Sequence, residues 1–130
     1  MASIFTKIIK GEIPSYKIAE DENYFAFLDI SPVSKGHTLV VPKKEIDYIF
    51  DLDDELLGGL HIFAKKIAKA IEKSVKCKRI GTAVVGLEVP HAHLHLIPIN
   101  EISDLSFEKP KLKLSEEEFK VLLEKIKSNL

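Results

Sequence analysis

His91-Ala92-His93-Leu94-His95-Leu96-Ile97 places three histidines at strict alternation inside an apolar run. Successive side chains of a β-strand point to opposite faces, so this spacing predicts a strand with three imidazoles on one face, about 7 Å apart. The apolar residues between them are expected on the other face. Histidine titrates near neutrality and can act as acid, base, nucleophile or metal ligand. The stretch therefore predicts a functional site built on one strand.

Three interpretations of this strand are open. The polar face of a surface strand could simply be histidine. Alternatively, the rings could bind zinc, although a catalytic zinc usually takes three protein ligands at about 2.0–2.1 Å, and three rings in a row on a flat strand do not converge easily. The third interpretation is metal-free covalent catalysis, in which the central imidazole attacks an electrophile and its neighbours set its proton state. We favour the third.

The residues around this strand predict an α+β order with four or five mostly antiparallel strands and one long helix on a face of the sheet. Strands are expected at Tyr16–Ala19, Tyr24–Leu28, Thr38–Val41, Arg79–Val85 and Val89–Ile97. Helices are expected at Ile4–Ile9, from Asp53 to about Lys76, and from the capping box Ser115-x-x-Glu118 through Ser128. Gly58 and Gly59 inside the long helix suggest the close approach of another backbone.

Composition limits the class of protein. A chain of 130 residues is expected to form one domain around a single core. Its net charge of −1 argues against a broad nucleic-acid or membrane surface. The single cysteine, Cys77, excludes an internal disulfide and a Cys-x-x-Cys zinc site. No apolar stretch is long enough for a spanning segment, so a cytoplasmic location is the default expectation.

Several motifs in one order resemble the histidine triad (HIT) family of nucleotide hydrolases and transferases, in its phosphoramidase branch. The histidine run fits the pattern His-φ-His-φ-His-φ-φ, where φ is apolar. The other matching segments are Ser3–Pro14, Ala26–Pro32 and Gly36–Lys43, so the resemblance spans roughly residues 3 to 98. It implies one HIT domain over residues 1–130 with a C-terminal helical extension at about 111–130. It also implies a homodimer in which the long helix and a neighbouring strand pair across a two-fold axis.

The resemblance implies a role for each of four histidines. His93 matches the nucleophile of the family, which forms a nucleotidyl-histidine that water then cleaves. His95 matches the histidine that donates to phosphate oxygen near the leaving group. His91 and His37 match supporting histidines behind the nucleophile, where a chain of imidazoles would fix the tautomer of His93. No metal and no cofactor are expected.

The resemblance also implies a purine nucleoside pocket. Asp29 matches a carboxylate that accepts hydrogen bonds from the ribose diol, and its alternative role is a turn cap. The apolar clamp around the base would comprise Phe5, Phe27, Leu28 and Ile30. The chain departs from the family before the triad, where residues 83–90 lack the usual asparagine and serine. Phosphate contacts are then expected from backbone N–H groups, such as that of Val89, and Glu88 lies close to the leaving group.

These inferences predict a homodimeric, metal-independent hydrolase of purine nucleoside 5′-phosphoramidates or related nucleotide esters. Two alternatives remain: a hydrolase of dinucleoside polyphosphates, and a nucleotide-binding scaffold with slow turnover. A metallohydrolase is the least favoured. Nucleic acid and membrane are not expected as partners.

Overall fold

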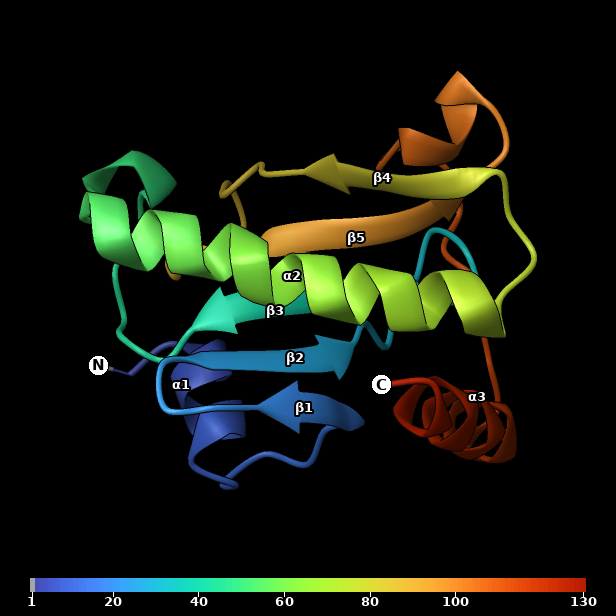
Figure 1. The fold of residues 1–130 in the computed structure, drawn as a ribbon, viewed down its shortest axis with the longest axis horizontal. Coiled ribbons are helices and arrows are strands. Elements are labelled where there is room, and N and C mark those ends of the chain that lie inside the picture. The colour runs from blue at the N-terminus through green and yellow to red at the C-terminus, as the bar shows by residue number, and fades with distance from the viewer. Residues whose placement is uncertain (1) are drawn as a thin grey trace.

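The computed structural model describes residues 2–130 and contains a five-stranded sheet with the strand order β1-β2-β3-β5-β4 (Figure 1). All neighbouring strands pair antiparallel. The strands are β1 (Lys17–Glu20), β2 (Tyr24–Leu28), β3 (Thr38–Pro42), β4 (Arg79–Ala83) and β5 (Leu94–Ile99). The helices are α1 (Ile4–Ile9), α2 (Asp54–Ser74) and α3 (Glu116–Ser128), with 3-10 helices η1 (Ile49–Asp51) and η2 (Ile102–Leu105). The predicted α+β class and antiparallel sheet are confirmed.

Helix α2 covers one face of the sheet (Figure 1). It begins after Asp53, whose side chain accepts the backbone N–H of Leu56, as an N-cap does. The apolar residues that recur every three or four positions are buried in the core between helix and sheet: Leu60, Phe63, Ile67 and Ile71. The amphipathic pattern of the sequence therefore orients α2 with its lysine-rich face outward.

The two faces of β2 carry different cores. Tyr24, Ala26 and Leu28 point toward α2 and belong to the larger cluster. The alternate residues, Phe25 and Phe27, point to the opposite face, where they pack with Phe5 of α1 in a smaller cluster. This second face also holds the histidines, so α1 and the functional site share one side of the sheet.

The strand that carries the histidine run is shorter than predicted. β5 begins at Leu94, so only His95 of the three histidines lies within it. Pro90 has no N–H to donate, the His91 N–H bonds to the Val89 carbonyl, and the Ala92 N–H bonds to the Ile46 carbonyl. Before Leu94, the backbone N–H groups therefore bond to carbonyls of loop residues and not to a neighbouring strand. β4 likewise ends at Ala83 instead of Val85.

The close approach expected near Gly58 and Gly59 comes from a side chain of the same chain. A Cβ atom at Gly59 would overlap the hydroxyl of Tyr24, whereas one at Gly58 would meet nothing within 4 Å. The Tyr24 hydroxyl donates a hydrogen bond to the Leu56 carbonyl at 2.9 Å. Only a glycine lets this buried tyrosine reach the first turn of α2.

Helix α3 begins at the predicted capping box, in which Ser115 and Glu118 each accept the other's backbone N–H. It packs beside α2 and β1 through Phe119, whose ring stacks on Tyr16 at 4.7 Å. The Asn129 amide donates to the Ser74 hydroxyl at 2.9 Å. The C-terminal extension is therefore joined to the main core.

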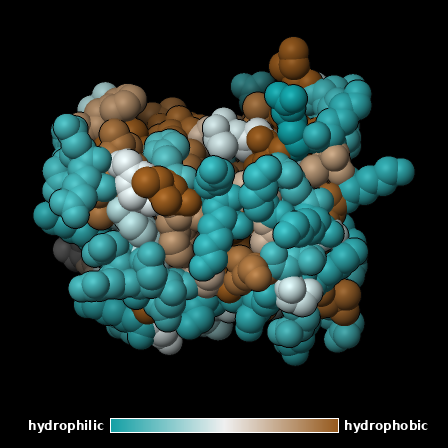
Figure 2. All heavy atoms as spheres, in the orientation of Figure 1, coloured by the Kyte–Doolittle hydropathy of each residue, from teal (hydrophilic) through white to brown (hydrophobic). Residues whose placement is uncertain are grey.

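The outer surface on the α2 side is mostly hydrophilic (Figure 2). Hydrophobic groups gather at the upper left of that view, near the N-terminal end of α2. Tyr48 and Phe50, which precede α2 in the sequence, have exposed side chains. Within residues 2–130, no helix combines the length and the apolar character needed to cross a membrane.

Candidate active site

His37 and His95 form a buried, hydrogen-bonded pair. Gly36 adopts a positive φ of 98° directly before His37, and this turn brings the histidine to the start of β3. The Val33 N–H donates to His37 Nδ1 at 3.1 Å, so the proton of the neutral ring is on Nε2. That proton points to His95 Nδ1, 2.9 Å away. The remaining nitrogen of neutral His95, Nε2, therefore carries a proton and can donate.

Both rings of this pair stay neutral at pH 7. Burial, followed by the charges of Lys111 and His93, lowers the pKa of His37 to about 4. Burial and the neighbouring His37 lower the pKa of His95 to about 3. Desolvation disfavours the charged imidazolium in each case. The site therefore presents hydrogen-bond donors without imidazolium charge from these two residues.

His91 is fully buried behind the site and is held at both nitrogens. Its Nε2 lies 2.8 Å from the Pro42 carbonyl oxygen, which can only accept, so Nε2 carries the proton. Its Nδ1 lies 2.7 Å from the Ser3 hydroxyl, which must donate. Burial lowers the pKa of His91, in agreement with a neutral ring. The tautomer of His91 is thus fixed by α1 on one side and by β3 on the other.

Ser3 is itself held in place by a short network at the start of α1. Its hydroxyl oxygen accepts the Thr6 N–H as the N-cap of the helix. Its backbone N–H donates to Glu45 at 2.6 Å, and the Thr6 hydroxyl donates to the same carboxylate oxygen at 2.6 Å. These two bonds lower the pKa of Glu45 to about 2. Neither Ser3 nor Glu45 carries a recognisable sequence signal for this role, since the N-cap of a short helix is common.

His93 presents a free nitrogen to the site. Its Nδ1 lies 2.7 Å from the His91 carbonyl oxygen, so Nδ1 must donate and Nε2 keeps an unprotonated lone pair in the neutral ring. Nε2 of His93 and Nε2 of His95 have no hydrogen-bond partner within the described part of the chain. Every fully buried side-chain nitrogen or oxygen in residues 2–130 does have one, so these two nitrogens are not fully buried. They are therefore open to the cavity that both residues line.

The predicted chain of imidazoles behind His93 is replaced by a different arrangement. His37 bonds to His95, and the partner of His93 is a backbone carbonyl. His91 acts on His93 through its main chain, because its own ring points away toward Ser3 and Pro42. Sequence spacing placed the three histidines together but gave no information on their long-range partners.

A cavity of about 390 Å³ opens in front of His93 and His95. The His93 ring meets the edge of Phe5 at 4.9 Å, and the His95 ring meets Phe107 at 4.7 Å. The other lining residues are Ile4, Asp29, Ser31, His37, Leu39, Val85, Gly86, Leu87, Glu88, Val89 and Lys111. Phe107 and Lys111 were not anticipated, because a charged segment after the last strand resembles an ordinary solvated loop.

The residues predicted for the nucleoside pocket separate into three groups. Phe5, Asp29, Glu88 and Val89 line the cavity, and Phe27 supports Phe5 from behind at 5.6 Å between ring centres. The Leu28 side chain lies in the core under α2, because strand alternation turns it away from the site. The Ile30 side chain is exposed and is not part of the lining. The expectation that Leu28 and Ile30 border the pocket is therefore corrected.

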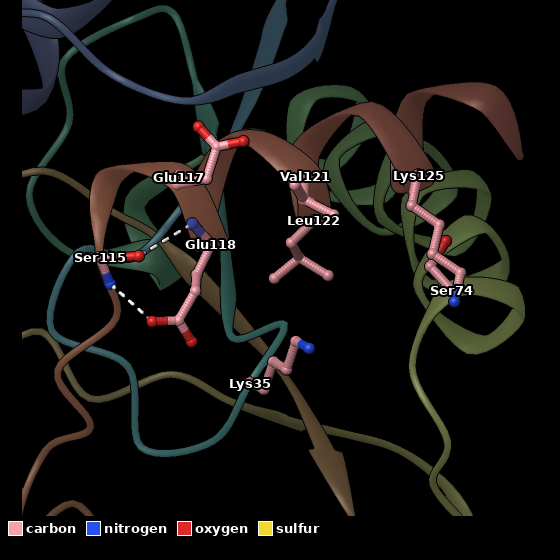
Figure 3. A pocket seen from close by; sticks show the side chains of 8 residues that line it. All are labelled: Lys35, Ser74, Ser115, Glu117, Glu118, Val121, Leu122 and Lys125. Carbon is pink, nitrogen blue, oxygen red and sulfur yellow. Dashed lines mark hydrogen bonds between the residues drawn. The ribbon is translucent and has the colours of Figure 1, made fainter.

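A second hollow of about 300 Å³ lies between α3 and the C-terminal end of α2. Figure 3 shows the Ser115–Glu118 capping bonds at one end of it and Lys125 beside Ser74 at the other. Its lining consists of Lys35, Ser74, Ser115, Glu117, Glu118, Val121, Leu122 and Lys125. None of the four site histidines borders it.

A small antiparallel α+β domain whose cavity is lined by histidines of the run His-φ-His-φ-His-φ-φ is typical of the histidine triad class of proteins. Comparison with known proteins agrees: the HIT domain family matches residues 10–102. The chain is 39% identical over 132 residues to an adenosine 5′-monophosphoramidase of Schizosaccharomyces pombe, covering all of this chain and 99% of that protein. This chain belongs to the HIT family.

Solved structures support the same family. A HIT-like protein from Bartonella henselae, crystallised with an unknown ligand, superposes with a TM-score of 0.85 at 34% identity, covering 98% of this chain and 96% of that one. A zinc-bound histidine triad protein from Mycobacterium smegmatis superposes with a TM-score of 0.81 at 30% identity, covering 98% and 95%.

The zinc in that relative raises the question whether the donors here suit a metal. The carboxylate of Asp29 and the rings of His37 and His95 offer ligand atoms within 4.8 Å of one another. Two nitrogens at about 2.0–2.1 Å from a tetrahedral zinc would lie about 3.3 Å apart. Here the two nitrogens are 2.9 Å apart, and the Val33 N–H fixes a proton between them. In this arrangement the pair forms a hydrogen bond and does not fit a shared metal ion.

Proposed function

We propose that this protein hydrolyses the phosphorus–nitrogen bond of purine nucleoside 5′-phosphoramidates through a covalent intermediate on His93. The observation that carries the proposal is the tautomer of His93. Its Nδ1 proton is committed to the His91 carbonyl, so the Nε2 lone pair faces the cavity. A neutral imidazole with an exposed lone pair is a competent nucleophile toward phosphorus. The homologous adenosine 5′-monophosphoramidase supports the choice of substrate.

The steps follow from the proton positions. His93 Nε2 attacks phosphorus, a phosphorus–nitrogen bond to the ring forms, and the bond to the leaving amine breaks. His95 Nε2–H lies beside the same cavity and donates a hydrogen bond to a phosphoryl oxygen. A water molecule gives one proton to the departing amine. The resulting hydroxide attacks phosphorus, which breaks the bond to His93 Nε2 and releases the nucleoside 5′-monophosphate. His37 holds the donor in place through the 2.9 Å bond to His95 Nδ1.

Nucleoside recognition is assigned to the apolar wall and to one carboxylate. Phe5 offers an apolar surface for the purine, with Phe27 behind it. Asp29 lines the cavity, and its Oδ1 accepts the Ser31 N–H at 2.8 Å, which orients the carboxylate. Glu88 also lines the cavity and supports an amine as leaving group over a polyphosphate, because a carboxylate repels an anion.

A homodimer is part of the proposal. β4 pairs with β5 on one side only, so the other edge of this strand is free of partners within residues 2–130. An open sheet edge is a ready template for pairing with a second copy. The family resemblance predicts pairing through the long helix and a neighbouring strand, and we assign this role to α2 and β4. A reducing cytoplasm is the compartment we assign.

The test is intact mass spectrometry after rapid quenching with an adenosine 5′-phosphoramidate. The wild type should show a nucleotidyl adduct that the His93→Ala variant lacks, together with loss of turnover. The exposed His61 on α2 provides a matched control, since His61→Ala should keep both adduct and activity. Near-normal turnover by His93→Ala would refute the mechanism. Unfolding of that variant would be recognised by its melting curve, and His93→Asn then serves as the second variant.

A further inference from the structure

The cavity contains more negative than positive charge. The carboxylates of Asp29 and Glu88 line it, and the pKa values of His37 and His95 leave those rings neutral at pH 7. A nucleoside 5′-phosphate would add further negative charge to this enclosed space. Lys111 is the one lysine or arginine among the lining residues that the structure describes. Any permanent cationic partner for the phosphate from this lining must therefore be Lys111.

Lys111 belongs to a segment that folds back over the site. We call residues 102–112 the strap; they follow β5 and begin with η2. The Phe107 ring packs edge-on to His95 at 4.7 Å, and the Leu112 N–H donates to the Pro32 carbonyl at 2.8 Å. Lys111 lies between these two attachment points. The strap is thus fixed beside the histidines by an aromatic contact and a main-chain bond.

The Lys111 side chain bonds within the strap and forms no ion pair with any residue from 2 to 130. It is exposed, its Nζ donates to the carbonyl oxygen of Phe107, and no carboxylate within residues 2–130 lies within ion-pair distance of it. Its Nζ lies 5.7 Å from the centre of the Phe107 ring, which itself contacts His95. By contrast, the nearby Lys109 is paired with Asp104 at 3.7 Å. Lys111, the lysine that lines the cavity, therefore has no ion-pair partner within residues 2–130, whereas Lys109 has one.

We propose that Lys111 binds the phosphoryl oxygens of the nucleotide, and that the strap thereby supplies the phosphate contact that the asparagine and serine missing from residues 83–90 would otherwise make. The inference rests on the proposal that a nucleotide occupies this cavity. An ammonium group gains a charge-assisted hydrogen bond from a phosphate oxygen, and a largely enclosed pocket screens that attraction less than bulk water does. Adenosine, which lacks the phosphate, gains nothing from this contact.

The test compares the equilibrium affinities of AMP and adenosine by calorimetry, so that it does not depend on turnover. Lys111→Met should weaken AMP binding by about tenfold, the low end for a charged hydrogen bond, and leave adenosine binding within about twofold. Lys111→Arg keeps the charge and should restore most of the AMP affinity. Lys113→Met changes an exposed lysine outside both cavities and should leave both affinities unchanged.

Each other outcome overturns the inference. If Lys111→Met leaves AMP affinity unchanged, the phosphate does not contact Lys111. If AMP and adenosine lose affinity equally, the residue only shapes the wall of the cavity. If the wild type binds neither ligand, both this inference and the proposed function are wrong, whereas a formed adduct on His93 with no effect of Lys111→Met contradicts the inference alone.

Discussion

Replacing Ser3 with alanine tests whether α1 holds the site histidines in place. The hydroxyl donates to His91 Nδ1 at 2.7 Å and accepts the Thr6 N–H at 3.0 Å, and its oxygen also lies 3.3 Å from the Thr6 hydroxyl. His91 is fully buried, so water does not reach the acceptor that loses its donor. An unsatisfied buried acceptor costs about 1–3 kcal/mol, and the loss of a serine N-cap costs about 1 kcal/mol. We expect the free energy of unfolding to fall by about 2–4 kcal/mol in total.

The control for this change is Ser115→Ala, which removes the N-cap of α3 far from the cavity. It should lower the free energy of unfolding by about 1 kcal/mol, with kcat unchanged. Ser3→Ala should lower kcat as well, because His91 Nδ1 keeps only the longer, 3.4 Å contact with the Thr6 hydroxyl, and the His91 carbonyl then orients His93 less well. Urea unfolding gives the stability, and single-turnover kinetics give the chemical step.

The reasoning would be refuted by a Ser3→Ala variant that loses no more stability than Ser115→Ala and keeps full kcat. Ser3→Thr retains a hydroxyl at the N-cap and should recover most of both properties. A variant that loses stability but keeps kcat would limit Ser3 to a structural role.

Four further results are expected. Asp29→Asn should shrink the preference for ribonucleotides over 2′-deoxyribonucleotides, which is about 1–2 kcal/mol for a charged hydrogen bond, as calorimetry would show; equal wild-type affinities would contradict the role of Asp29. Glu88→Ser should lower the ratio of phosphoramidate to polyphosphate specificity constants by raising the polyphosphate rate, and an unchanged ratio would mean that Glu88 faces solvent. Burial holds the pKa values of His37 and His95 at about 4 and about 3, below the ordinary histidine pKa of 6.5, so the unfolded chain binds more protons below pH 6.5. The stability that these rings contribute is thus complete above pH 6.5 and falls by up to about 1.4 kcal/mol per pH unit for each ring toward pH 4, which urea titrations across this range would reveal. Dialysis against a chelator should leave turnover unchanged, and recovery of lost activity by added zinc would contradict metal independence.

Local signals in the sequence predicted the elements well. Ser115 and Glu118 lie three residues apart and cap a helix by their own bonds, so α3 was located from its sequence alone. The apolar period of α2 likewise identified its buried face. Such signals depend on neighbours within one or two turns, which the order of residues specifies directly.

Partners far apart in the chain could not be predicted in the same way. The His91 ring bonds to the Ser3 hydroxyl, which is 88 positions away in the sequence. The Ala92 N–H bonds to the Ile46 carbonyl, which lies in a loop, and not to a neighbouring strand. Alternation fixed which face the histidines share but not where β5 begins. The strap residue Phe107 had no periodic pattern around it, and its contact with His95 arises only once η2 has turned the chain back.

The contact between Gly59 and Tyr24 also constrains how this sequence can diverge. A side chain at position 59 would displace the tyrosine hydroxyl and break its bond to the Leu56 carbonyl, so neither residue can change freely alone. Tyr24→Phe removes the hydroxyl but keeps the ring, whose Cζ atom would still crowd a new Cβ. Paired replacement, with a shorter residue at position 24, is the route that keeps α2 seated on the sheet. Across homologues, positions 24 and 59 should covary. A designer who replaces Gly59 with a residue of higher helix propensity must also change Tyr24 on β2.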